Sequence, residues 1–146
     1  MPSYSDYINI TLLERGVYPL AGQIVQMDAD DFVRMADDYN KQKSRRDAPI
    51  VVGHPEGDAP IYGSVSHLQE RDNKLIATFT ISSESFRQLW KQGAYSRYEP
   101  EFYAPDNPKN PKPGSWFLKH VGFIGPVPNM QGVLKGEASV ISEGAK

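Results

Sequence analysis

Three histidines, His54, His67 and His120, are the side chains of this 146-residue chain best suited to act as a general base near neutral pH. His54 follows an apolar segment and opens a turn bounded by glycine and proline, where scaffold-positioned side chains often carry function. His120 alternates with Leu118, so we predict a half-buried strand residue that shares a face with Leu118. His67 lies beside a predicted hairpin turn and is expected to be exposed. His54 is therefore the first candidate base, although a lone histidine is more often structural.

Glu99 and Glu101 flank Pro100 in the segment YSRYEPEFY. On an extended backbone, residues i and i+2 point to the same face, so the two carboxylates could share a proton or hold a cation. Pro100 has no N–H to donate, which predicts a sheet edge or a bulge. A glycosidase needs its two carboxyl groups about 5 Å or more apart across a sugar. We favour instead a solvated pair or an ion pair with Arg97.

The chain contains no cysteine, which excludes disulfides, thiolate zinc sites, iron–sulfur clusters and cysteine nucleophiles. His54, Asp58, Glu99 and His120 have suitable chemistry for a metal site, but their spacing matches no ligand pattern. We therefore predict no bound metal and no cofactor.

Charge and composition exclude several classes of partner. The 18 acidic and 16 basic residues leave a net charge of -2, which argues against a protein that coats nucleic acid. Aromatic residues are frequent over 90–123 with few basic residues between them, so core packing or a protein interface explains them better than nucleic-acid stacking. The sequence has neither 18 consecutive apolar residues nor a basic leader followed by an apolar run, so neither membrane insertion nor export is indicated.

The patterning predicts one α+β domain over residues 1–125 and an extended tail over 126–146. A helix should begin after Asp28 as N-cap, with an apolar face at residues 32, 35, 36 and 39. Ser82 or Ser83 should cap a second helix that ends at Gly93. A hairpin turn is expected over 70–73. Strands are predicted over residues 8–14, 23–27, 50–52, 61–68, 74–81, 95–104 and 116–124.

Five of the twelve prolines fall within fourteen positions, at and after Pro100. The segment 104–115, APDNPKNPKPGS, is therefore a loop. A loop of this composition should be ordered only by packing on something else. It is either a mobile excursion or a contact surface, and the sequence leaves both open.

The order of several motifs resembles the capsid protease/scaffold proteins of Mu-like tailed phages, the prophage Mu protein I family. These motifs are ITLLERGVY, DADDFVRMADDYN, IVVGHP, APIYGSVSHLQERDNKLIATFTIS, KQGAYSRYEPEFY and HVGFIGPVPNM, and they span most of residues 8–130. The resemblance implies a fold similar to that of the herpesvirus assemblin and phage prohead proteases. That fold is a small, mainly antiparallel β-barrel with two flanking helices.

The resemblance also implies that His54 corresponds to the base of a serine protease and that a serine should stand directly before the proline. Glu99 occupies this position. A carboxylate cannot repeat acyl transfer by serine, and its charge would oppose a developing oxyanion. Ser96 could act as the nucleophile only through a register shift or a bulge beside Pro100, with His120 as third member. We favour no catalytic site.

Relatives of this kind usually continue into a long scaffolding region, which we expect this chain to lack. Both departures imply a protease fold retained without proteolysis. We expect a non-enzymatic decoration or cement protein that binds the lattice of the phage major capsid protein, alone or as a homo-oligomer. It would be made in the cytoplasm of the host bacterium and carried on the virion capsid. The alternatives are an active head-maturation protease using His54 and Ser96, and an internal head scaffold protein.

The candidate capsid contacts lie on the two late strands and the proline-rich loop, where aromatic and charged side chains alternate. They are Tyr98, Glu99, Glu101, Tyr103, Asn107, Lys109, Lys112 and Trp116.

Overall fold

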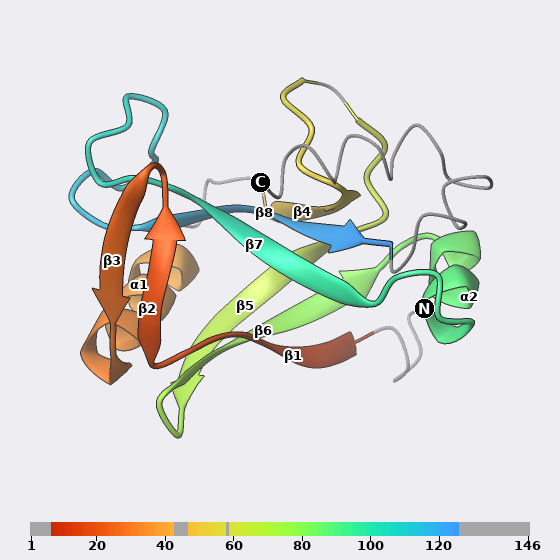
Figure 1. Cartoon of the computed structure of the whole chain (residues 1–146), viewed down its shortest axis with the longest axis horizontal. Coiled ribbons are helices and arrows are strands. Elements are labelled where there is room, and N and C mark those ends of the chain that lie inside the picture. Colours follow the sequence, from red (N-terminus) through yellow and green to blue (C-terminus); the bar gives the residue numbers. More distant parts are fainter. Residues whose placement is uncertain (1–6, 43–46, 58, 126–146) are drawn as a thin grey trace.

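The computed structural model describes residues 7–42, 47–57 and 59–125, which form an α+β domain with two helices and eight strands (Figure 1). The expected tail over 126–146 lies outside the described residues. In chain order the elements are β1 (Tyr7–Glu14), β2 (Gly16–Leu20), β3 (Gln23–Met27), α1 (Ala29–Lys41), β4 (Ala48–Val52), β5 (Gly63–Arg71), β6 (Lys74–Ile81), α2 (Glu84–Lys91), β7 (Arg97–Tyr103) and β8 (Phe117–Ile124).

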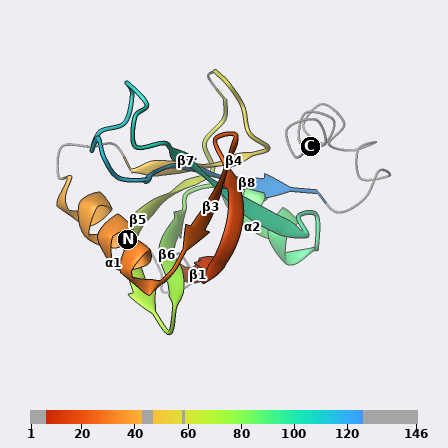
Figure 2. The same ribbon diagram turned by 60° about the vertical axis from the view of Figure 1, so that its left-hand side comes forward.

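Six strands form one curled sheet in the order β1-β6-β5-β4-β8-β7. Neighbours run antiparallel, except that β4 and β8 run parallel. The sheet curls into a half-barrel whose edge strands are β1 and β7 (Figures 1 and 2). The expected mainly antiparallel sheet with two helices is confirmed, but the barrel closes only halfway. Within the described residues no hydrogen-bonded ladder joins β1 to β7.

Helix α1 begins as its sequence predicts. The Asp28 side chain accepts hydrogen bonds from the backbone N–H groups of Asp30 and Asp31, and the Asp31 carboxylate accepts one from the N–H of Asp28. This reciprocal capping satisfies donors that a helix start otherwise leaves unpaired. The predicted apolar face, Phe32, Met35, Ala36 and Tyr39, is buried against β5, β6 and β8.

The buried phenol of Tyr39 ties α1 to the sheet. It donates a hydrogen bond to the carbonyl of Val65 at 2.6 Å and accepts one from the N–H of Ala48 at 2.8 Å. Because both partners are backbone groups, the polar end of a fully buried ring is satisfied without water.

Helix α2 is capped by Ser83, whose hydroxyl accepts from the N–H of Phe86, and Gly93 follows the helix with φ of +85°. Only Phe86 of this helix is buried. Its ring packs edge-on against Phe123 of β8, with 5.0 Å between ring centroids. The rings of Trp90, Tyr95 and Tyr98 also pack against Phe123. Core packing therefore accounts for much of the aromatic content.

Strand β2 is an element that the sequence did not predict. Gly16 and Pro19 weaken the strand pattern, since glycine is poorly suited to strands and proline cannot donate to a ladder. Proline is nevertheless tolerated here, because β2 pairs only with β3 in a separate two-stranded sheet. The hairpin turns at Ala21 and Gly22, both with positive φ, and stands beside β7 in Figure 1.

The proline-rich loop is built around the buried amide of Asn110. Its Nδ2 donates to the carbonyls of Ala104 and Ser115, and its Oδ1 accepts from the N–H of Lys112. The loop is thus held by its own hydrogen bonds. This corrects the expectation that only packing on another surface could order it.

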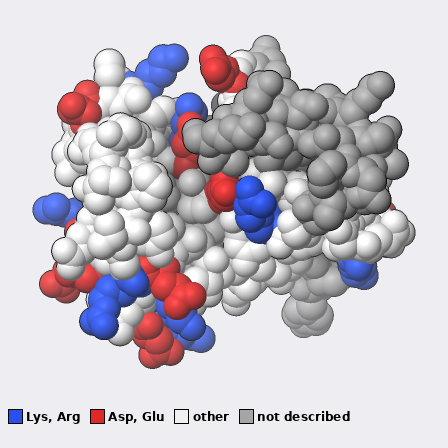
Figure 3. All heavy atoms as spheres, viewed as in Figure 1, with Lys and Arg blue, Asp and Glu red and all other residues white. Residues whose placement is uncertain are grey.

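The part of the chain that the structure describes includes no helix of the length and apolarity needed to cross a membrane. Acidic and basic side chains are interspersed over the face seen in Figure 3.

Candidate functional site

The parallel pairing of β4 with β8 brings His54 to the late strands. Val52 pairs with Phe123, and the N–H of Gly53 continues the ladder by donating to the carbonyl of Phe123 at 3.0 Å. Gly53 has φ of +75°, which turns the chain at the end of β4 and places His54 over the sheet.

Gly122 makes this approach possible. A Cβ atom there would lie 2.1 Å from the carbonyl oxygen of Gly53 and 3.1 Å from Cε1 of His54. A side chain of any size would therefore push the His54 turn away from β8.

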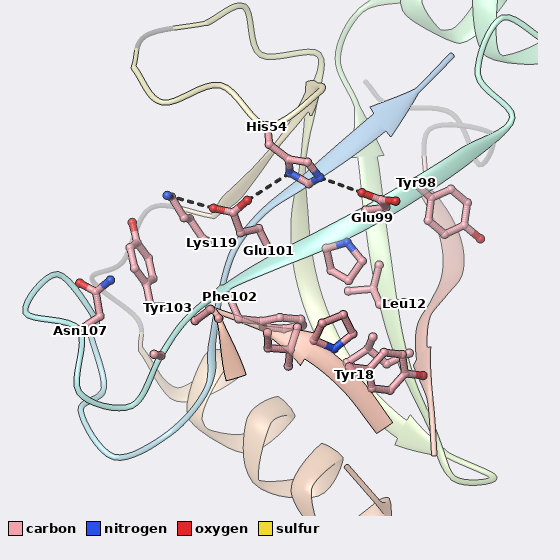
Figure 4. Close-up of a pocket in the computed structure, with 17 residues that line it drawn as sticks. Leu12, Tyr18, His54, Tyr98, Glu99, Glu101, Phe102, Tyr103, Asn107 and Lys119 are labelled. Carbon is pink, nitrogen blue, oxygen red and sulfur yellow. Dashed lines mark hydrogen bonds and ion pairs between the residues drawn. The ribbon is translucent and has the colours of Figure 1, made fainter. Parts of the chain in front are cut away.

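Three side chains meet the ring of His54, as Figure 4 shows for the two glutamates. Its Nε2 lies 3.0 Å from Oε1 of Glu99, and its Nδ1 lies 3.2 Å from Oε1 of Glu101. The same Nδ1 lies 2.8 Å from Nε2 of His120. The two glutamates contact one ring, which agrees with the prediction that residues i and i+2 of this strand share a face.

A β-bulge completes the cluster. Glu101 pairs with His120 and Phe102 pairs with Leu118, so Lys119 is the extra residue of β8. Glu101 consequently contacts both Lys119, with Nζ 3.2 Å from Oε2, and His120, with Nε2 3.6 Å from Oε1. The bulge interrupts the simple alternation by which Leu118 and His120 were expected to share one face. His120 is also more deeply buried than predicted, at 5% exposed.

Arg97 forms an ion pair with the carboxylate oxygen of Glu99 that does not contact His54. Its Nε donates to Oε2 of Glu99 at 3.2 Å, which confirms the expected ion pair. Pro100 lies on β7, an edge strand of the sheet. This confirms the prediction of a sheet edge, which was made because proline has no N–H to donate.

The protonation states follow from these contacts. The hydrogen bond to Glu101 raises the pKa of His54 above 6.5; burial opposes this shift and the hydrogen bond to Glu99 adds to it. Burial lowers the pKa of His120 to about 4. The hydrogen bond from His54 lowers the pKa of Glu101 to about 2. Burial opposes ionisation of Glu99, but hydrogen bonds from His54 and Arg97 outweigh it and lower the pKa of this carboxyl.

His54 is therefore an imidazolium between two carboxylates below its raised pKa, and His120 is neutral at pH 7. Both ring N–H groups of His54 donate, and Nε2 of His120 accepts, which leaves the proton of His120 on Nδ1. Because the two glutamates raise the pKa of His54, this ring accepts a proton from a nucleophile only above that raised pKa.

Ser96 lies outside this cluster. It is exposed and precedes β7, where its backbone N–H donates to the carbonyl of Ile124. Within the described residues, the partners of the His54 ring nitrogens are Glu99, Glu101 and His120. Neither the register shift nor the bulge suggested for Ser96 places its hydroxyl against His54, because the bulge lies on β8 beyond Glu101.

A cavity of about 820 Å³ opens beside the cluster, between the β2–β3 hairpin and β7. It is lined by His54 and Lys119, by Leu12 and Tyr18, and by much of β7 (Figure 4). Five of the expected capsid contacts line it: Tyr98, Glu99, Glu101, Tyr103 and Asn107. The others lie elsewhere, with Lys109 and Lys112 exposed on the loop and Trp116 half-buried.

The fold also gathers possible metal ligands that sequence spacing did not indicate. One donor atom each from His54, Glu101 and His120 lies within 4.8 Å of the others. Asp58, which was weighed as a ligand, lies outside the described residues. Lys119 was not predicted as a site residue. No local sequence pattern predicts the bulge of β8 that turns this lysine toward β7.

Comparison of the chain with protein-family models, curated proteins and solved structures finds no match. The resemblance to the phage capsid proteases is therefore carried by the motifs of this sequence alone.

Proposed function

We propose that this chain is a non-enzymatic capsid protein of a tailed phage that binds the major capsid protein with a domain descended from a head-maturation protease. The proposal depends above all on one observation. Glu99, at the position that the resemblance assigns to the nucleophilic serine, lies 3.0 Å from Nε2 of His54, the residue assigned as the base. The contact expected between nucleophile and base is thus present, but as an ion pair.

The charges of this cluster oppose proteolysis. An acyl-transfer site needs a neutral base beside a hydroxyl or thiol, and donors aimed at a developing oxyanion. Here Glu99 and Glu101 both contact the ring of His54, so the assigned base has carboxylates beside it in place of a hydroxyl. These contacts favour the protonated form of His54 and place no hydroxyl of the described residues against its ring nitrogens.

The finer fold assignment is part of the same proposal. We regard the half-barrel as an opened relative of the assemblin and prohead protease barrel. The motif order supports this assignment, and so does the side-chain contact between His54, which lies in the turn after β4, and Glu99, which directly precedes Pro100 on β7.

The cavity beside β7 is the proposed surface for the capsid protein. It offers the aromatic rings of Tyr98 and Tyr103 together with the charged groups of Glu101 and Lys119. The exposed Lys109 and Lys112 on the neighbouring loop extend this surface. Aromatic side chains are enriched at protein interfaces, and polar groups surround them at the rim.

Mass spectrometry of purified virions tests the proposal. We expect the chain in mature heads, in fixed stoichiometry with the major capsid protein. Its presence in proheads but absence from mature heads would overturn the proposal in favour of an internal scaffold.

A second candidate function is head-maturation proteolysis with Ser96 as nucleophile. The observation that favours it is the 2.8 Å contact between His54 and His120, which could orient a base. Purified protein should be incubated with the capsid precursor, beside the His54→Ala and Ser96→Ala variants. We expect no cleavage by any of the three. Cleavage by the wild type that both variants abolish would establish the protease instead.

A further inference from the structure

Three donor atoms in the His54 cluster surround a single point. Nδ1 of His54 and Nε2 of His120 are 2.8 Å apart, and Oε1 of Glu101 lies 3.2 Å from the first and 3.6 Å from the second. Ligands of a tetrahedral Zn²⁺ site lie about 2.0–2.2 Å from the ion and so stand roughly 3.3 Å from one another. The three distances bracket that value. An ion can therefore be placed at ordinary bonding distance from all three atoms with little movement of the chain.

The surroundings of these atoms are also those of a metal site. A histidine that binds a metal through one nitrogen almost always donates its other N–H to a carboxylate or carbonyl, and a ligating carboxylate is itself hydrogen-bonded. Nε2 of His54 has Glu99 as such a partner at 3.0 Å, and Oε2 of Glu101 has Lys119 at 3.2 Å. Both contacts leave the three inner atoms free to face one ion.

The two histidines are more deeply buried than the glutamate, which is partly exposed, as expected for a metal site that is open on one side. The side chains of His120 and His54 are 6% and 14% exposed, whereas that of Glu101 is 38% exposed. His54 and Glu101 also line the cavity beside β7. A fourth ligand, such as water, can therefore approach from the cavity, while the histidine side is closed by protein.

We propose that His54, Glu101 and His120 form a binding site for a divalent transition-metal ion, with Zn²⁺ the best match. Two imidazoles and one carboxylate suit Zn²⁺ and its neighbours, whereas Mg²⁺ and Ca²⁺ prefer shells made of oxygen. The ion takes the place of the proton on Nδ1 of His54, which is released on binding. It joins the end of β4 to β7 and β8 and so fastens one edge of the half-barrel. The site does not depend on the capsid role proposed above.

Isothermal titration calorimetry of the full, untagged chain with ZnCl₂ tests the site, after EDTA treatment and its removal. We expect one ion per chain. Glu101→Gln, which keeps size and removes the ligand charge, should weaken binding at least about tenfold. Glu99→Gln, which alters the hydrogen bond behind His54, should weaken binding by a smaller factor. His67→Ala is the matched control, because His67 is an exposed histidine on β5 away from the cluster, and it should bind as the wild type does.

A second measurement guards against variants that fail to fold. Co²⁺ added to the wild-type chain should give the visible absorption of a four-coordinate ion, and excess Zn²⁺ should abolish it. Circular dichroism must show that Glu101→Gln is folded before its affinity is interpreted. The proposal is overturned if the wild type shows no saturable binding tighter than about 1 mM. It is equally overturned if folded Glu101→Gln binds as tightly as the wild type, if His67→Ala alone removes binding, or if MgCl₂ competes equally well.

Discussion

At the scale of single residues, His54 and His120 favour opposite protonation states although their ring nitrogens lie 2.8 Å apart. His54 is partly accessible and lies between two carboxylates, so its charged form is stabilised. His120 is buried and faces that positive ring, so its neutral form is stabilised. The difference arises from position, because neither histidine differs from the other in its intrinsic chemistry.

This contrast predicts how the two imidazoles titrate in the metal-free protein. Side-chain NMR in the presence of EDTA should show His54 losing its proton above pH 6.5 and His120 gaining one only near pH 4. In terms of stability, the contribution of His54 is complete below pH 6.5 and disappears as the pH rises through its raised pKa. The contribution of His120 is complete above pH 6.5 and disappears as the pH falls toward 4. Titration of both rings at one common pH would contradict this account.

Glu99→Ser is the variant that would rebuild a serine beside His54. We expect no proteolysis from this variant, because Glu101 still raises the pKa of His54 and nothing has repositioned donors for an oxyanion. The measurement is cleavage of the capsid precursor by purified variant and wild type, followed by gel electrophoresis and mass spectrometry. Robust turnover by Glu99→Ser would show that a working site needs only the hydroxyl.

At the scale of elements, the cluster depends on the close crossing of the β4 turn over β8. Gly122 lacks a side chain at the point where the backbone of Gly53 passes. The bulge at Lys119 then turns two consecutive residues of β8 toward Glu101. Two backbone features, neither of them chemically reactive, therefore decide which side chains meet.

Gly122→Ala tests this crossing. The new methyl group would meet the backbone carbonyl of Gly53 at 2.1 Å, and a backbone atom cannot rotate out of the way as a side chain can. We expect a loss of about 3 kcal/mol in the free energy of unfolding, the upper part of the range for overpacking. Urea denaturation provides the measurement. Gly57→Ala is the control, since no atom lies within 4 Å of its added Cβ and little change is expected there.

At the scale of the whole molecule, the half-barrel is stabilised by an apolar interior while its charged cluster lies near one open edge. Buried side chains of α1, β5, β6 and β8 form a continuous core. The cluster joins β4, β7 and β8 where apolar packing gives way to the cavity. Stability should therefore respond to pH through a few identifiable groups.

Glu101 should contribute most clearly on the acid side. Its pKa is about 2 in the folded protein and ordinarily 4.5, so its stabilising contribution is complete above pH 4.5 and is lost as the pH falls toward 2. Urea unfolding of wild type and Glu101→Gln in EDTA should show a stability difference at pH 5 that shrinks by pH 3. Glu56→Gln, at an exposed position, serves as control. A difference that stays constant between these pH values would show that the Glu101 charge is not involved.

Much of the secondary structure was predictable because it is written in local patterns. Asp28 and the apolar spacing after it predicted α1, and the alternation of apolar residues predicted β6. The bounds predicted for β3 agree with the structure. Strand β2 was missed because it relies on one hairpin partner and contains proline. Closure of the barrel was overestimated, since whether β1 and β7 meet depends on the curl of the whole sheet.

The sequence by itself determined the kinds of chemistry open to this protein: no thiol chemistry, three histidines, and a glutamate where the resemblance expects a serine. It also determined that Glu99 and Glu101 share a face, because that follows from the two-residue period of a strand. Only the tertiary structure decided that His54 and His120, 66 positions apart, lie 2.8 Å from each other. The parallel pairing of β4 and β8, the bulge at Lys119 and the bare backbone of Gly122 are long-range features. Their energies depend on neighbours distant in sequence, so no local pattern could reveal them.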